Sequence, residues 1–159
     1  MPEDRVKVLF DLKKDGDGYP PADTERLWAE PLGNNLFKID NVPFFVKGIS
    51  CEDVVEASSD TEGELRYRSL VRPSSHSTLR VILFRESPDP RPIEDRVADL
   101  RRQLEEVGCS TELSHIPGLI AVDTDSASID RAFGVLRSGE KANLWEYEEG
   151  AKRTREFER

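Results

Sequence analysis

Residues 79–148 carry the pattern that most restricts how this chain can fold. Leu79–Phe84 is largely apolar on both faces, which is typical of a strand inside a covered sheet. Pro92 fits a first helical turn, and Gly108 is a natural helix end. Between them one apolar stripe with helical spacing predicts an amphipathic helix, at Ile93, Val97, Leu100, Leu104 and Val107.

The rest of this region predicts three strands and a second helix. The strands are Cys109–Leu113, Leu119–Asp123 and Leu144–Glu148. Asp125 or Ser126 can cap the helix, which would end at Gly139. The order strand, helix, strand, strand, helix, strand is that of a ferredoxin-like unit. We therefore expect a four-stranded antiparallel sheet with both helices on one face.

The first half predicts a β-rich module without a long helix. Short apolar segments separated by turn residues are typical of a small barrel or a strongly bent sheet. The predicted strands are Val6–Leu12, Glu25–Glu30 (or one helical turn), Leu36–Ile39, Val42–Val46, Asp53–Ala57 and Leu65–Val71. The expected α+β fold is a barrel-like module at 1–78, packed on a ferredoxin-like module at 79–150, with a charged tail at 151–159.

The charge of the chain disfavours several functions. Its 32 acidic side chains exceed its 23 Lys and Arg, for a net charge of -9. Nucleic-acid binding requires local positive charge, so a protein partner fits better, and our hypothesis is a basic one. A ferredoxin-like RNA binder also needs aromatic and basic residues on its central strands, and Gly118–Asp123 has neither. No membrane span or signal peptide is predicted, so a cytoplasmic protein is expected.

Three groups of residues suggest chemistry, and each has a simpler interpretation. Cys51 with His76 and Asp53 could form a thiol nucleophile with its base, but no local signature supports this. The acidic turn at 11–17 fails the calcium-loop template in either register. Ser74–Thr78 lacks the glycines of an anion-binding loop and is better explained as a polar hinge. No cofactor or metal is therefore expected.

Five motifs carry a resemblance to a known family: Tyr19-Pro20-Pro21, Glu25-Arg26-Leu27-Trp28-Ala29, Asn41-Val42-Pro43-Phe44-Phe45, Asp53-Val54-Val55 and His76-Ser77-Thr78-Leu79-Arg80. With them the chain resembles a bacterial family known as domain of unknown function 4265. The resemblance is densest in residues 6–85 and implies a bacterial cytosolic protein without a defined activity. The family often has Gly before Asp-Val-Val, where this chain has Glu52, so a tight turn there is in question.

The leading functional hypothesis is a non-enzymatic protein that binds another protein, as a regulator or an antitoxin-like neutraliser. A small-molecule sensor is the alternative, by analogy with other ferredoxin-like units, and an enzyme comes third. Homo-oligomerisation is left open. The expected binding surface lies on the first module near the junction, at Glu25, Trp28, Asn41, Phe44 and His76. Burial of Trp28 and Phe44 in the core is the competing interpretation.

Overall fold

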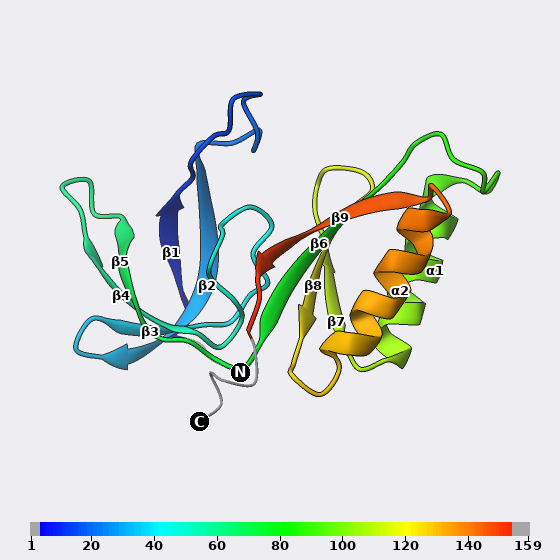
Figure 1. The fold of residues 1–159 in the computed structure, drawn as a ribbon. Coiled ribbons are helices and arrows are strands. Elements are labelled where there is room, and N and C mark those ends of the chain that lie inside the picture. Colours follow the sequence, from blue (N-terminus) through cyan, green and yellow to red (C-terminus); the bar gives the residue numbers. More distant parts are fainter. Residues whose placement is uncertain (1–3, 154–159) are drawn as a thin grey trace.

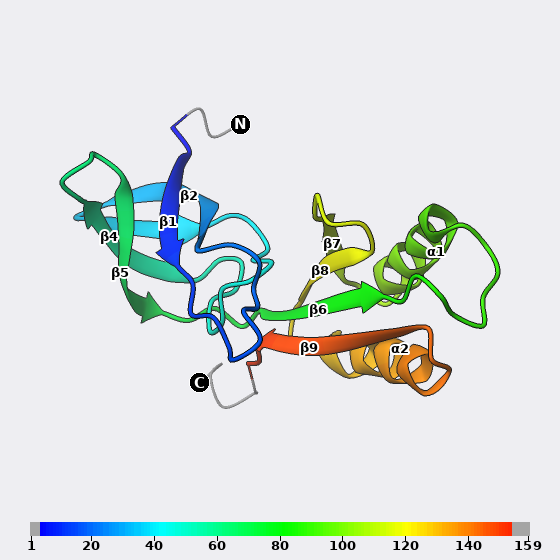
Figure 2. The same cartoon turned by 90° about the horizontal axis from the view of Figure 1, so that it is seen from above.

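The computed structural model describes residues 4–153, which form a barrel beside a sheet with two helices on its far side (Figures 1 and 2). The fold is α+β. The barrel strands are β1 (Val6–Asp11), β2 (Thr24–Gly33), β3 (Leu36–Ile39), β4 (Val54–Ser59) and β5 (Leu65–Arg72). Neighbours in this series pair antiparallel, and a parallel contact between Leu9 of β1 and Arg66 of β5 closes the barrel.

Alternation along the strands fills the barrel interior. Val8 and Phe10 of β1 belong to the barrel core with Leu27 and Ala29 of β2, two residues apart on each strand as the period of a strand requires. The segment between β3 and β4 adds apolar side chains to this core, which are Val46 and Ile49. Residues 42–46 were predicted as a strand, and this prediction is wrong, because they form a loop with no ladder partner.

The second module has a four-stranded sheet in the order β7-β8-β6-β9, with every neighbouring pair antiparallel. Its strands are β6 (Ser77–Leu83), β7 (Ser110–Leu113), β8 (Leu119–Thr124) and β9 (Trp145–Ala151). The helices are α1 (Ile93–Glu106) and α2 (Ile129–Lys141). Figure 2 shows both on the side of the sheet away from the barrel.

A single apolar core fixes the helices on that face. Leu100 and Leu104 of α1 and Phe133 and Leu136 of α2 belong to the same buried cluster as the alternate residues of β6, Leu79, Val81 and Leu83. Trp145 and Tyr147 of β9 contact this cluster too and so share one face of the strand. Gly139 was predicted to end the second helix, but it lies inside α2. A Cβ atom there would come within 1.9 Å of the Trp145 ring.

The end of the chain is more than a charged tail. Ala151 is the last residue of β9, and the Arg153 side chain is buried at 7% exposure. The rest of the predicted charged tail, residues 154–159, lies outside the described residues. Neither helix in the described part is long and apolar enough to cross a bilayer.

Candidate functional site

The two modules meet through polar groups, and Arg80 on the helix-free face of β6 is the largest of them. Its side chain is 2% exposed. The guanidinium donates to the carbonyl oxygens of Pro43 and Val46 in the barrel loop and to Glu148 on β9. Gly150 leaves room for this guanidinium, because a Cβ atom at position 150 would lie 2.7 Å from Arg80 Cζ. Arg80 therefore ties the loop to the sheet and is occupied by internal partners.

A buried ion pair joins the end of the chain to the barrel. Asp53 is fully buried and accepts from Arg153 Nη2 at 2.6 Å. The backbone N–H groups of Ser50 and Ser74 also donate to it, at 2.9 and 2.7 Å. Burial raises the pKa of Asp53, and these donors and Arg153 oppose the rise. Because two N–H groups and a cation surround the carboxylate, its charge is satisfied inside the protein.

His76 is held by a carboxylate from each side. Its Nδ1 lies 2.9 Å from both oxygens of Asp123, and its Nε2 lies 2.6 Å from Glu52. Hydrogen bonding to Asp123 raises the pKa of His76 against the opposing effect of burial. Asp123 belongs to β8 and Glu52 to the barrel, so a protonated His76 bridges the two modules.

Cys51 and His76 are not arranged as nucleophile and base. The Cys51 thiol is directed at the carbonyl oxygen of Ile39, 3.9 Å away. Burial, reinforced by Asp123 and Glu52, raises the pKa of Cys51 to about 12. A nucleophilic thiol needs the opposite shift. Both ring nitrogens of His76 contact carboxylates, so the geometry gives no support to thiol catalysis at this site.

The other four residues of the expected surface lie in or beside the barrel loop between β3 and β4. Two of them, Glu25 and Asn41, hold this loop in place. The Glu25 carboxylate accepts from three successive N–H groups, of Phe44, Phe45 and Val46, at 2.7 to 3.1 Å. Asn41 accepts from the Trp28 N–H and donates to Glu112 of β7. Glu25 and Asn41 are thus engaged inside the molecule.

Phe44 and Trp28 correct two expectations about aromatic residues. Phe44 is half-buried in the loop between β3 and β4 and is not part of the barrel core. Trp28 is 39% exposed and not in the core. The side chains of Arg5 and Lys7 lie over its ring, 4.9 and 4.8 Å from the centroid. This surface combines an aromatic ring with two cations, of which Arg5 is paired with Asp40.

A groove of about 500 Å³ lies on the helix-free face of the sheet beside the loop. Ile82 of β6 faces Leu119 of β8 on one side and Glu146 of β9 on the other. Glu148 of β9 lies opposite Arg80 of β6 and adds a second carboxylate on the β9 side of the groove. Tyr19, from the loop between β1 and β2, also lines it. We call this the junction groove: it has an apolar floor and a rim of two carboxylates.

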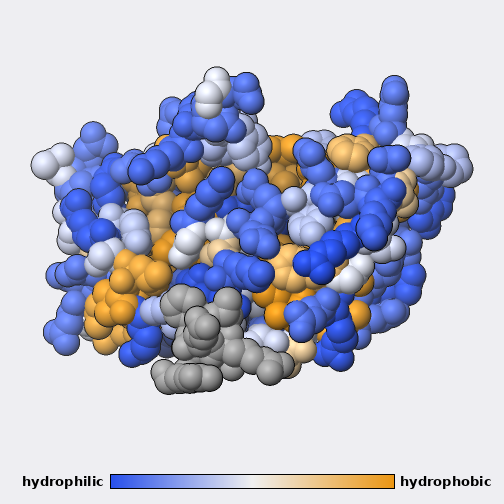
Figure 3. All heavy atoms as spheres, viewed as in Figure 1, coloured by the Kyte–Doolittle hydropathy of each residue, from blue (hydrophilic) through white to orange (hydrophobic). Residues whose placement is uncertain are grey.

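The junction groove adjoins a second hollow at the open end of the barrel. This cavity of about 350 Å³ shares Tyr19 with the groove and is lined largely by apolar and aromatic side chains, including Phe10, Phe45 and Tyr67. The rings of Phe10 and Tyr67 stack at 4.7 Å, and Tyr19 meets Phe45 edge to face at 6.1 Å. Elsewhere hydrophilic side chains cover most of the face seen in Figure 3.

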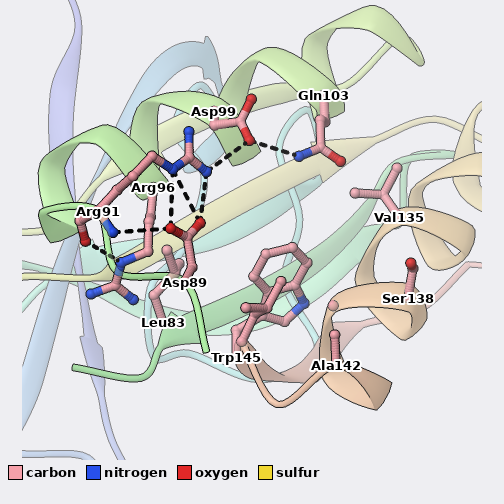
Figure 4. A pocket seen from close by; sticks show the side chains of 12 residues that line it. Leu83, Asp89, Arg91, Arg96, Asp99, Gln103, Val135, Ser138, Ala142 and Trp145 are labelled. Atoms are coloured by element: carbon pink, nitrogen blue, oxygen red, sulfur yellow. Dashed lines mark hydrogen bonds and ion pairs between the residues drawn. The ribbon is translucent and has the colours of Figure 1, made fainter. Parts of the chain in front are cut away.

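A third pocket, of about 140 Å³, lies between α1 and α2 (Figure 4). Its polar groups are paired with one another. Arg91 binds Asp89 and Asp99, and Arg96 donates to three backbone carbonyls of the segment 84–91. Because these charges satisfy each other, we assign this network to holding the connection between β6 and α1.

From the sequence we expected the binding surface on the first module near the junction, and the groove beside it was not expected. None of the five expected residues lines the groove. A signal for it was present, because Trp145 and Tyr147 on one face leave Glu146 and Glu148 on the other. An arginine inside an apolar strand, Arg80, also marks a place where a buried cation needs partners.

Three comparisons place the chain among known proteins. A family described as a domain of unknown function (DUF4265) matches residues 25–147. A solved structure, described as a novel crystal structure of a hypothetical protein from Neisseria gonorrhoeae, has a TM-score of 0.73. It shares 18% sequence identity and covers 92% of this chain and 94% of its own. At that identity the likeness concerns the fold alone. No curated protein matches the sequence.

Proposed function

We propose that this chain, which belongs to the DUF4265 family, is a non-enzymatic protein that binds a basic segment of another protein. The junction groove carries the proposal. Glu146 offers negative charge beside the apolar side chains of Ile82 and Leu119, and Glu148, already paired with Arg80, adds a second carboxylate. A partner that brings Lys or Arg together with an apolar side chain matches both features.

The charged groups of the groove and of the whole chain favour a cationic partner over an anionic one. Arg80 is the one cation among the residues that line the groove in the described chain, and its guanidinium is already bound to Glu148 and two carbonyls. It is therefore not available to an incoming anion. The chain as a whole carries a charge of -9, which attracts a basic partner over a longer range and speeds its association.

We further infer that the second module is a ferredoxin-like unit. The strand order β7-β8-β6-β9, antiparallel pairing and two helices on one face support this interpretation. In such a unit the second face of the sheet is free to bind. Here the barrel covers part of that face and leaves the junction groove beside it. We expect this protein to act in the cytoplasm as a regulator or a neutraliser of its partner.

The test is capture of partners by the full chain and two variants. Glu146→Lys reverses a charge on the groove rim, and Glu62→Lys makes the same change at an exposed residue between β4 and β5. We expect Glu146→Lys to lose a basic protein that wild type and Glu62→Lys both retain. The bound protein should also dissociate as salt rises. Equal yields of the same partner from all three proteins would refute the role of the groove.

A small-molecule sensor is the second candidate, and the size of the groove favours it. Ligand pockets are commonly about 300–1,000 Å³ and mostly apolar with a few polar groups, and the junction groove of about 500 Å³ falls in this range. An amphiphilic amine has the same chemistry as a basic peptide side chain. If no protein is captured, and such amines stabilise wild type saturably but do not stabilise Glu146→Lys, the result would support the small-molecule sensor.

A further inference from the structure

The outer edge of the sheet beside the junction groove is open. β9 pairs with β6 alone, and β7 forms the opposite edge. β9 has 7 residues and β7 has 4, so β9 offers the longer edge. A strand at an edge presents unpaired N–H and C=O groups that can accept another strand.

The barrel covers only the far end of β9. The Gly48 N–H donates to the Gly150 carbonyl at 2.8 Å. Within residues 4–153 no hydrogen bond from outside the sheet reaches the backbone of residues 145–149. Residues 146–148 of β9, which line the groove, thus lie within the part of this strand whose outer edge is open.

The side chains of β9 determine what can pair there. Glu146 and Glu148 project to the groove face, and Glu149 is exposed near the covered end. A second copy of β9 would oppose glutamates to glutamates, and like charges across a strand pair are destabilising. A strand with Lys or Arg at every second position would instead place its cations beside Glu146 and Glu148, since side chains on one face repeat every two residues.

We propose that the basic partner segment binds as an added β-strand along residues 145–149 of β9. Its backbone extends the sheet, its alternate Lys or Arg side chains pair with Glu146 and Glu148, and it closes the open side of the junction groove. This mode of binding rests on the proposed function, because it specifies how a basic segment engages the same site. Main-chain hydrogen bonds then supply affinity, and the charge pattern supplies selectivity.

The probes are three short peptides matched in length to β9. The first alternates Lys and Val, the second alternates Glu and Val, and the third is the Lys–Val peptide with N-methyl groups on alternate backbone nitrogens. N-methylation removes donors while it keeps the charge. We measure affinity by titration with full-length protein, and hydrogen exchange of the amides of residues 145–149.

We expect the Lys–Val peptide to bind and to slow exchange in residues 145–149. The N-methyl peptide should bind at least about tenfold more weakly, because each N-methyl group removes a backbone donor to the sheet. The Glu–Val peptide should not bind, and Glu146→Lys should weaken the Lys–Val peptide while Glu62→Lys should not.

Other outcomes overturn the proposal in distinguishable ways. Equal binding of both Lys–Val peptides without protection of residues 145–149 refutes strand addition, yet leaves a basic partner in the groove. Binding of none of the peptides also refutes strand addition, and the capture experiment then decides the proposed function independently. Protection of residues 145–149 without peptide, in a protein that sediments as a dimer, identifies a second copy as the occupant.

Discussion

His76 shows how much one residue contributes to the contact between the modules. Its ring joins Asp123 of the sheet to Glu52 of the barrel. Glu52 adopts a φ of 70°, a left-handed conformation that costs a residue with a side chain about 1 kcal/mol or more. A left-handed turn is thus formed at Glu52, and its side chain carries the carboxylate that binds His76.

The raised pKa of His76 predicts how stability depends on pH. Because the folded state raises the pKa above about 6.5, protonated His76 stabilises the fold fully below that pH, and the contribution is lost as pH rises through the folded pKa. The unfolding free energy of wild type minus that of His76→Gln should therefore be largest near pH 6 and shrink towards pH 9. Asp123 and Glu52 are the main charged groups facing the ring.

Denaturant titrations across this pH range measure the difference, with His115→Gln in the exposed segment between β7 and β8 as the matched control. A difference that grows with pH would contradict the bridge between the carboxylates.

At the scale of helices and strands, the regular pattern of the second module made its sequence informative. The stripe from Ile93 to Leu104 and the apolar strands at β6 and β8 each predict a local structure and a buried face together. Reliance on local apolar pattern also explains why residues 42–46 were wrongly predicted as a strand. The Val and Phe residues of this loop resemble a strand, but Pro43 removes a donor, and Glu25, distant in sequence, takes the next three N–H groups.

Leu104 tests the shared core of the sheet and its helices. It is fully buried on α1 in the cluster that includes β6 and α2. Leu104→Asp should lower the unfolding free energy by about 3 kcal/mol or more, because it buries a carboxylate without a partner. Chemical denaturation measures the loss, and Glu105→Asp on the exposed side of α1 is the control. Stability like that of wild type would mean that the helix packs through another face.

For the whole molecule, the sequence predicted that the halves pack together but not what lies between them. The helix-free face of the sheet meets the barrel. The face carries Thr78, Arg80 and Asp123 near the barrel, and these bind polar groups of the barrel loop and the linker. Such pairs join residues far apart in sequence and depend on backbone positions, so neither periodicity nor composition predicts them.

The polar contact between the modules should make the protein unfold as one unit. Calorimetry of wild type should give one transition with equal calorimetric and van't Hoff enthalpies. Arg153→Met leaves the buried Asp53 carboxylate without its cation, which costs about 3–5 kcal/mol. Adding Asp53→Asn should recover part of that loss. Two resolved wild-type transitions, or an Arg153→Met protein that melts normally, would show that the modules are energetically independent.

The pairing of Asp53 with Arg153 also bears on synthesis of the chain. The two residues are 100 positions apart. On the ribosome the strands of the barrel emerge first and can begin to fold, while the cation that neutralises Asp53 is still untranslated. β9, the outer neighbour of β6, is also translated after the barrel. A nascent chain stalled before Arg153 thus holds a barrel whose buried acid has no counter-charge.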